Sequence, residues 1–181
     1  MRSILRIDAQ DDGEPPSSQE GRSPAWDILG DAERRALELV LGRELLELCP
    51  SLADHEEVRL SVSFLTPDEI RAVSLEHRGQ DEATDVLSFP LWEEAGAFVP
   101  PPAGGPPLLL GDVLICPEEA ARLWPGLSEE EASCLMLAHA FLHLLAWDHD
   151  TEERRRAMWD RQDALKAKLL EALDAVEEGP A

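Results

Sequence analysis

The sequence has few cysteines, and none of them is paired at a spacing that binds metal. Only three occur in 181 residues, Cys49, Cys116 and Cys134, and they are scattered along the chain. Their odd number and the lack of a CxxC pair argue against a disulfide framework and against a zinc site built from thiolates. We therefore expect three reduced thiols packed in the interior.

Basic residues are also scarce. The chain carries 16 Lys and Arg against 38 Asp and Glu, which gives a net charge of −22. A surface of this sign repels phosphate backbones, so broad nonspecific adhesion to nucleic acid is excluded. A role on RNA would have to come from a defined site, and we expect no DNA partner.

Long hydrophobic runs are missing as well. The longest mostly apolar stretch, Cys134 to Trp147, contains two histidines and is too short to span a bilayer. The N-terminal stretch "MRSILRIDAQDDGEPPSSQEGRSP" holds no apolar run of the length that a signal peptide needs. We expect a cytoplasmic protein without a membrane partner.

Periodicity and capping signals predict a mixture of strands and helices. "VRLSVSFL" alternates like a half-buried strand, and the helix predicted after it has Thr66 as N-cap and Pro67 at its first position. Ser128 and Glu131 form a capping-box pair at the start of a later helix. The run "WEEAGAFVPPPAGGP" predicts a loop rather than an element. Further strands are expected in "ILRIDAQ", "TDVLSFPL" and "PLLLGDVLIC", and further helices over residues 31–49, from "CPEEAARLW" and over the long C-terminal "TEERRRAMWDRQDALKAKLLEALDAVEE".

Three of the five histidines fall within eleven positions of an otherwise apolar helix and its end, as H-x3-H-x5-H. His139 and His143 are one helical turn apart and project from the same face, while His149 follows where a reversing chain can bring it back. Three neutral imidazoles with a fourth position left to water are typical of a catalytic zinc site, where the metal lowers the pKa of water to about 7. The pattern predicts one Zn²⁺ per chain.

These histidines have two other interpretations. A single histidine in such a segment is more often a satisfied core or surface residue, and we expect that of His55, as a solvated loop residue. A metallopeptidase of the HExxH type has its general base directly after the first histidine, but that position is Ala140 here.

Three motifs together resemble one known family. "HAFLHLLAWDH" resembles HGxLHLxGYDH, "LEHRGQDEATDVLSFP" resembles NxxYRGKDxxTDVLSFP, and "LLLGDVLIC" resembles LGDIVIC. All three occur in the order of the YbeY family, metal-dependent endoribonucleases of ribosomal RNA maturation, and the resemblance runs from "RIDAQDD" to the C-terminal helix.

The resemblance implies a fold and an activity. It implies an α/β (α+β) fold with a small central four-stranded mixed sheet flanked by about five helices, and a zinc site at the end of the histidine-bearing helix. It implies cleavage of single-stranded RNA in small-subunit rRNA 3′-end processing and ribosome quality control, with the small ribosomal subunit or ribosomal proteins as partners. His139, His143 and His149 match the zinc ligands, and Arg78 matches an arginine regarded as essential for cleavage.

The sequence departs from the family pattern beside both parts of this site. Both motif glycines are alanines, Ala140 and Ala146, and a left-handed Ala146 at the helix end would cost about 1 kcal/mol that bound metal could offset. Ser74 replaces an asparagine and His77 an aromatic residue next to Arg78.

Other polar residues near the motifs have two interpretations each. We expect Asp85 and Asp148 either to fix a histidine tautomer or to form a strand-entry turn and a helix-end cap. Asp112 could face the site or end a strand ladder. Thr84 and Ser88 could donate to phosphate, and the basic run at residues 154–156 is either a solvated helix face or a guide for RNA.

Three functions therefore compete. The first is a zinc-dependent endoribonuclease acting on rRNA through Arg78 and the histidines. The second is a zinc-stabilised ribosome-assembly factor with little cleavage activity, which the net charge of −22 favours because ribosomal proteins are basic. The third is another zinc hydrolase, such as a peptidase or amidase with a base from elsewhere in the fold.

The length suits one globular domain, since 44% of its residues are hydrophobic. We expect residues 1–27 to form a first strand and a flexible acidic Pro/Ser-rich segment, residues 28–176 a single catalytic domain, and residues 177–181 a disordered tail.

Overall fold

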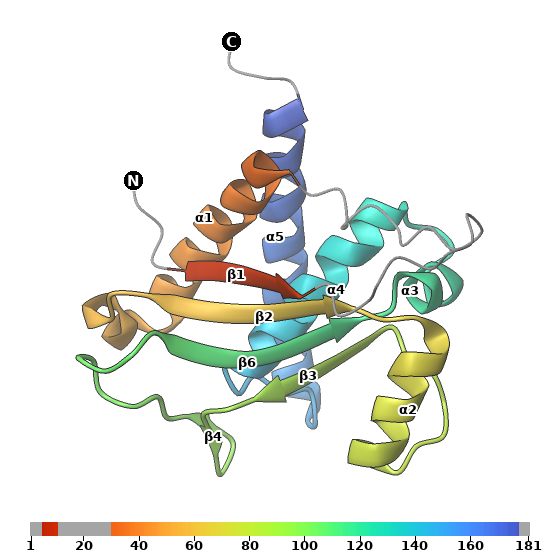
Figure 1. The fold of residues 1–181 in the computed structure, drawn as a ribbon, viewed down its shortest axis with the longest axis horizontal. Helices are drawn as coiled ribbons and strands as arrows, with labels where there is room; N and C mark the ends of the chain where they lie inside the picture. The colour runs from red at the N-terminus through yellow and green to blue at the C-terminus, as the bar shows by residue number, and fades with distance from the viewer. Residues whose placement is uncertain (1–4, 11–29, 178–181) are drawn as a thin grey trace.

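The computed structural model describes residues 5–10 and 30–177 (Figure 1). The predicted flexible segment and nearly all of the predicted tail lie outside these residues, and Glu177 is the last residue of a helix. The elements in chain order are β1 (Leu5–Gln10), α1 (Asp31–Leu48), η2 (Pro50–Asp54), β2 (Val58–Phe64), α2 (Pro67–Arg78), β3 (Val86–Pro90), β4 (Glu93–Glu94), β5 (Ala97–Phe98), β6 (Leu108–Ile115), α3 (Pro117–Leu123), α4 (Glu129–Leu144) and α5 (Glu152–Glu177).

The central sheet has four strands in the order β1-β2-β6-β3. β1, β2 and β6 run parallel, and β3 is an antiparallel edge strand beside β6. This mixed four-stranded sheet with five α-helices among the described residues confirms the predicted fold. None of the helices in residues 5–10 and 30–177 is long and apolar enough to cross a membrane.

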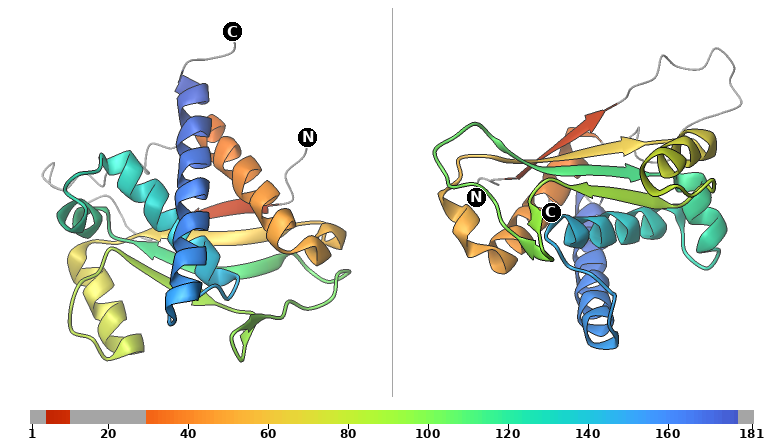
Figure 2. Two further views of the ribbon diagram at one scale, coloured as in Figure 1. Left: turned by 180° about the vertical axis from the view of Figure 1, so that it is seen from behind. Right: turned by 90° about the horizontal axis from the view of Figure 1, so that it is seen from below.

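The helices α1, α4 and α5 lie together on one face of the sheet, and α2 lies at the end near the turn into β3 (Figures 1 and 2). The main core forms between that helical layer and the inward residues of the strands, such as Leu60 of β2 and Val113 of β6. A second, smaller cluster packs Ile70 of α2 against Leu87 of β3 and Cys116. Because the helical layer covers one face of the sheet, the opposite face carries the outward side chains of the strands and α2.

The helices α2 and α4, which carry parts of the family motifs, both begin at capping boxes. The Thr66 hydroxyl accepts from the Glu69 backbone N–H, and the Glu69 carboxylate accepts from the Thr66 N–H. Ser128 and Glu131 form the same pair at the start of α4. These reciprocal bonds satisfy N–H groups that the helix itself leaves without partners, which confirms the predicted starts.

The segment between β3 and β6 is not the plain loop that the sequence predicted. It contains the short antiparallel hairpin of β4 and β5. Beside the hairpin, the Trp92 indole N–H donates to the Leu109 carbonyl oxygen over 2.7 Å, and the Val99 N–H donates to the Trp92 carbonyl oxygen over 2.7 Å. The prolines and glycines indicate a loop, whereas the Trp92 bond to β6 and the Val99 bond within the segment organise it as a hairpin.

The burial of His55 differs from the prediction. This residue was predicted to be a solvated loop residue, but it is 9% exposed in the structure. The 3-10 helix η2 ends at His55, whose backbone N–H donates to the Leu52 carbonyl oxygen, and Leu52 is fully buried. This tight turn holds His55 against the core.

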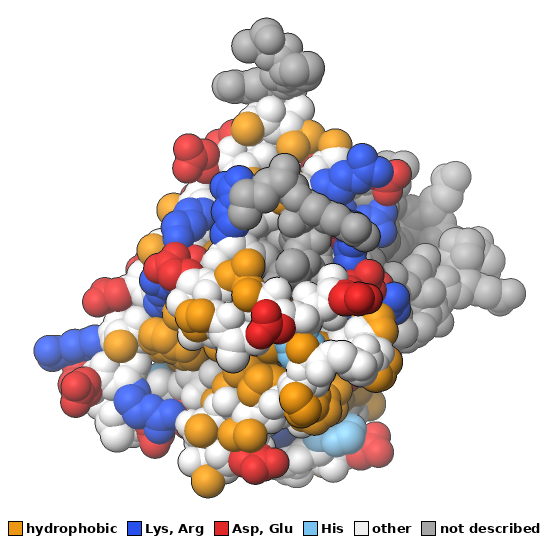
Figure 3. All heavy atoms as spheres, turned by 90° about the vertical axis from the view of Figure 1, so that its left-hand side faces the viewer, with side chains coloured by type: hydrophobic (Ala, Val, Ile, Leu, Met, Phe, Trp, Pro, Cys, Tyr) orange, Lys and Arg blue, Asp and Glu red, His pale blue; other side chains and the backbone are white. Residues whose placement is uncertain are grey.

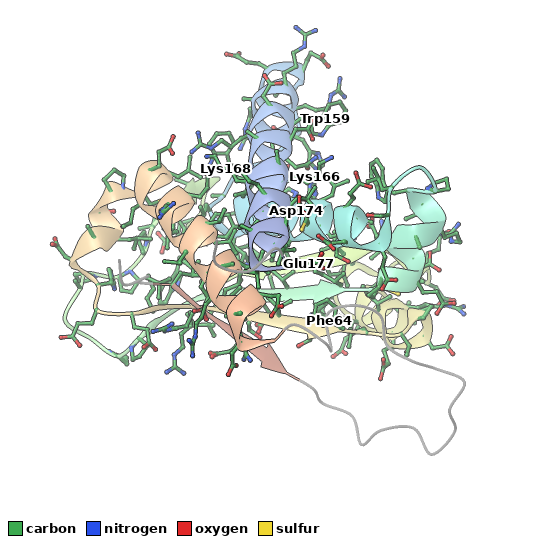
Figure 4. All side chains as sticks on the ribbon, turned by 90° about the horizontal axis from the view of Figure 1, so that it is seen from above. Phe64, Trp159, Lys166, Lys168, Asp174 and Glu177 are labelled. Atoms are coloured by element: carbon green, nitrogen blue, oxygen red, sulfur yellow. The ribbon has the colours of Figure 1, made fainter. Side chains whose placement is uncertain are left out.

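The long helix α5 buries one stripe and exposes the rest. Met158, Leu165, Leu169 and Leu173 are buried, as their helical spacing predicted. Trp159 lies on the part of α5 that extends beyond the neighbouring helices, while Lys168 lies on the side of α1 and Lys166 on the side of α4 (Figure 4). The Lys168 ammonium is 3.0 Å from the Glu44 carboxylate, which joins α5 to α1.

Gly111 allows α4 to approach the sheet closely. It has a φ of 150°, and a Cβ built on it would lie 2.2 Å from the Phe89 carbonyl oxygen and 2.9 Å from a methyl group of Leu144. Leu144 is the last residue of α4. The absence of a side chain at Gly111 therefore lets β3, β6 and the end of α4 meet.

We predict that Gly111→Ala lowers the free energy of unfolding by about 3 kcal/mol or more, because both the φ angle and the contact with backbone oppose a Cβ. Denaturant unfolding measures the change. Gly105→Ala is the matched control, because a Cβ there meets nothing within 4 Å. Equal stability of the two variants would contradict this account of the packing.

Candidate metal centre

The two helical histidines lie in the most buried helix of the described structure. α4 buries residues around nearly its whole circumference, including Ala138, Ala140 and Phe141. His139 and His143 are half-buried, and their ring centroids are 4.6 Å apart. Ala140 is fully buried, so the position that carries the base in HExxH peptidases holds a packed methyl group here.

A sharp reversal after α4 returns the chain to these two histidines. Ala146 is left-handed, with a φ of 60°. Its N–H donates to the His143 carbonyl oxygen, and the Trp147 N–H donates to the Leu142 carbonyl oxygen. This pair of bonds defines a Schellman motif, which usually has glycine at the left-handed position. The position does demand a left-handed residue, which was the condition for the cost considered for Ala146 in the sequence.

The reversal brings the three histidines together. The His149 ring centroid lies 5.7 Å from that of His139 and 5.2 Å from that of His143. One ligand nitrogen from each of the three lies within 4.8 Å of the others, so the group could hold a metal ion. His149 is exposed, which leaves one side of the group open to solvent.

The nitrogens fit a small ion such as zinc. His139 Nε2 and His143 Nε2 are 3.1 Å apart. Two ligands of a tetrahedral zinc, each about 2.0–2.1 Å from the metal, stand about 3.4 Å apart, so only a slight opening is needed. Burial lowers the pKa of both histidines, that of His143 to about 4, with the neighbouring imidazoles acting in the same direction. Both rings are therefore neutral at pH 7, as metal ligation requires.

Gln162 fixes the orientation of His139, and the motifs did not reveal it. Its side-chain oxygen Oε1 lies 2.8 Å from His139 Nδ1. An amide oxygen can only accept, so Nδ1 carries the proton and Nε2 is left with a lone pair facing His143. The signal in the sequence was a polar residue between Met158 and Leu165 on the buried stripe of α5.

The carboxylates proposed as partners of the histidines bind elsewhere. Asp85 Oδ1 accepts from the Val86 N–H, and Oδ2 accepts from the Trp124 indole N–H over 3.0 Å. Asp85 thus forms the strand-entry turn that was one of its two interpretations. Asp148 accepts from the backbone N–H of His149 over 2.7 Å, so it steadies the turn rather than an imidazole ring.

Strand pairing places the remaining candidates on opposite faces of the sheet. Asp112 pairs with Phe89, and Ser88 pairs with Val113, which belongs to the core under the helices. Ser88 therefore faces the side of α4, whereas Asp112 faces away from it. The Thr84 hydroxyl donates to Asp85 over 3.1 Å.

Arg78 lies at the C-terminal end of α2 and is exposed. Within the described residues its side chain makes no hydrogen bond or ion pair, so the surface salt bridge that was its alternative role is not observed. The ring of the preceding His77 contacts that of Phe89 edge-on, with centroids 5.1 Å apart. This contact holds the end of α2 against the edge strand β3, whose other face is on the side of α4.

The basic run at residues 154–156 is largely ion-paired. Arg154 pairs with Asp150 over 2.8 Å, and Arg155 and Arg156 both pair with Glu152. The Arg155 guanidinium also lies 5.4 Å from the Trp159 ring centre. These contacts match the solvated helix face that was one interpretation of the run.

We predict that Ala146→Gly raises the free energy of unfolding of the metal-free protein by about 0.5–1 kcal/mol. Relief of left-handed strain, about 1–2 kcal/mol, exceeds the entropy that glycine adds to the unfolded chain, about 0.5–1 kcal/mol. Chemical denaturation measures it. Ala164→Gly, at an exposed position in the middle of α5, should instead lower the free energy of unfolding by about 1 kcal/mol. A loss in both variants would show that Ala146 is unstrained.

We predict that Gln162→Leu weakens metal binding about 10- to 100-fold, because the His139 ring loses the acceptor that sets its tautomer. Competition with a chromogenic chelator gives the affinity. Gln162→Glu keeps an acceptor at this place and should bind at least as tightly as the wild type. Unchanged affinity in Gln162→Leu would remove Gln162 from the site.

The chain is similar to known proteins of one family. A family model described as Endoribonuclease YbeY matches residues 32–170. The chain is 39% identical over 110 residues to an Endoribonuclease YbeY of Halalkalibacterium halodurans, covering 58% of this chain and 67% of that protein. It is 37% identical over 137 residues to one of Shouchella clausii, covering 69% and 86%. A solution structure of a Thermotoga maritima protein shares 26% identity, with a TM-score of 0.47, over 92% of this chain and 89% of the other. On the family match and the identities to the two Endoribonuclease YbeY proteins, the chain belongs to the YbeY family.

Proposed function

We propose that this protein is a zinc-dependent endoribonuclease that cleaves single-stranded RNA in the maturation of ribosomal RNA, at the 3′ end of the small-subunit rRNA, and in ribosome quality control. The observation that carries the proposal is the group of three histidines with ligand nitrogens within 4.8 Å of one another, in a member of the YbeY family. The group is open to solvent at His149. This supports a catalytic metal site, which keeps an open position, rather than a structural one, which is closed.

In this proposal the histidines hold one zinc ion and Arg78 binds the substrate. When bound, zinc supplies Lewis acidity and a nucleophile at neutral pH. His139, held by Gln162, and His143 present neutral nitrogens to the ion. Stabilisation of the remaining negative charge on the phosphate is assigned to the exposed Arg78, whose guanidinium can hydrogen-bond to two phosphate oxygens at once.

The edge strand β3 connects these two parts. The residue before Arg78 contacts Phe89 on one face of β3, while Ser88 on the other face lies on the side of α4. In this proposal the RNA strand crosses this edge, between the ion on the side of α4 and the arginine at the end of α2.

A second function is favoured by the charge. A chain of net charge −22 suits contact with basic ribosomal proteins better than contact with RNA. We therefore keep, as the alternative, a zinc-stabilised ribosome-assembly factor with little intrinsic cleavage. Zinc bound at one per chain with no RNA cleavage, together with co-sedimentation of the His143→Ala variant with ribosomes, would support that alternative.

We predict that Arg78→Ala lowers the rate of RNA cleavage about 100-fold or more while zinc stays bound at one per chain. The assay uses end-labelled single-stranded RNA, protein of measured metal content, a chelator and zinc add-back. His143→Ala should lose both the metal and the cleavage. A peptide substrate should remain uncut, which separates this activity from that of a peptidase.

Arg71→Ala is the matched control for Arg78→Ala. It removes the same charge from the same helix, and Arg71 is engaged with Asp81. We expect it to cleave at nearly the wild-type rate. If Arg78→Ala also cleaves at that rate, the role assigned to Arg78 is wrong.

A further inference from the structure

A small cavity adjoins the turn that carries His149. Its volume is about 220 Å³, and it is lined by residues of the β4–β5 hairpin, of the reversal after α4, and of the first turns of α5. Ligand pockets for drug-sized molecules have about 300–1,000 Å³, so this one suits a single planar ring system. The residues that line it are Gly96, Phe98, Leu145, Ala146, Trp147, Asp148, Arg154 and Ala157.

The hairpin wall of this cavity is held in place. The loop residues Ala95 and Gly96 have φ angles of 51° and 77°, as a two-residue hairpin loop with two left-handed positions requires. The Trp92 indole anchors the base of the hairpin to β6 through the Leu109 carbonyl oxygen. Phe98 packs against the main core and is only partly buried. The cavity is therefore formed before any ligand binds.

The side chains in the cavity suit a nucleobase. Phe98 and Trp147 are both aromatic and both only partly buried. Arg154, ion-paired with Asp150, adds a guanidinium to the lining. Unstacked bases of single-stranded RNA stack on aromatic rings and on arginine planes.

Another, larger cavity does not offer this chemistry. It has about 360 Å³, lies between β1, α1 and the start of β2, and is lined by four arginines and four carboxylates, whose charges cancel. It shares no residue with the histidine group. On the face drawn in Figure 3, hydrophobic side chains gather in the lower half among scattered acidic and basic ones. RNA affinity therefore has to come from local contacts.

We propose that the cavity lined by Phe98, Trp147 and Arg154 binds one unstacked base of the RNA, next to the phosphate that is cleaved. The proposal rests on the proposed endoribonuclease function. Trp147 is two residues from His149, so their Cα atoms are at most about 7 Å apart. Successive nucleotides stand about 3.4 Å apart when stacked and farther apart when unstacked, so the bound base lies within about two nucleotides of the phosphate at the histidines.

This base pocket also gives the hairpin a role. Its stacking contacts are made without net positive charge, so they add affinity for RNA that the acidic surface does not supply. We expect the pocket to bind extruded bases of any kind, since every base has a planar face. It would discriminate between flexible single strands and duplexes, in which the bases stay stacked.

The test is cleavage of a series of RNA oligonucleotides that carry one abasic nucleotide, moved stepwise across the cleavage site. The wild type should lose about tenfold or more in kcat/KM at one position within two nucleotides of the cut. Phe98→Ala should lose a similar factor on intact RNA and show no further loss at that position. Val99→Ala, an exposed neighbour that does not line the cavity, should behave as the wild type.

Folding and function are controlled separately. Phe98→Ala removes a side chain that packs on the core, so its folded fraction and metal content are measured at the assay temperature. Phe98→Leu, which keeps most of the packing but not the ring, should lose the same abasic sensitivity at nearly wild-type stability. A wild type that cleaves RNA with a profile identical to that of both Phe98 variants overturns the base pocket and leaves the nuclease intact. A wild type that cuts no RNA overturns the proposed function, and the base pocket with it.

Discussion

The reversal of the chain at Ala146 is the constraint on which the site depends. Two histidines one turn apart on a helix provide only two ligands, and the third must come from beyond the helix end. The Schellman bonds after Leu142 turn the chain within two residues, and Asp148 holds the next backbone N–H. A non-glycine residue in the left-handed position stores strain there, and strain at functional sites persists where the surrounding structure over-determines it.

Burial and ligand chemistry support one another in α4. The helix packs between the sheet and α5, so His139 and His143 lie where the charged form of imidazole is disfavoured. A neutral imidazole is the form that binds metal, and Gln162 of α5 selects the tautomer of His139. The same packing that stabilises the fold therefore prepares the donor atoms, with Gly111 admitting the end of α4 to the sheet.

The acidic composition constrains how RNA can be bound. Most arginines of the described structure are engaged with carboxylates, including the three at residues 154–156. Arg78 has no such partner among the described residues, at the edge where α2 meets β3. Recognition of RNA by so acidic a chain has to combine a few localised cations with the metal and with stacking, all of which act over short distances.

The sequence by itself determined the local elements and the identity of the three histidines. Capping boxes at Thr66 and Ser128 and the spacing of His139 and His143 are signals between neighbours, and the structure agrees with them. The strand β2 also forms where it was predicted, but it is buried on both faces rather than half-buried, because Ser61 and Ser63 are covered as well as Leu60 and Val62. Only the tertiary structure decided that Gln162 meets His139, that the segment around Trp92 forms a hairpin, that Asp112 faces away from α4, and that His55 is buried. These depend on contacts between segments distant in the chain, and neither spacing nor composition encodes which faces of the packed elements come together.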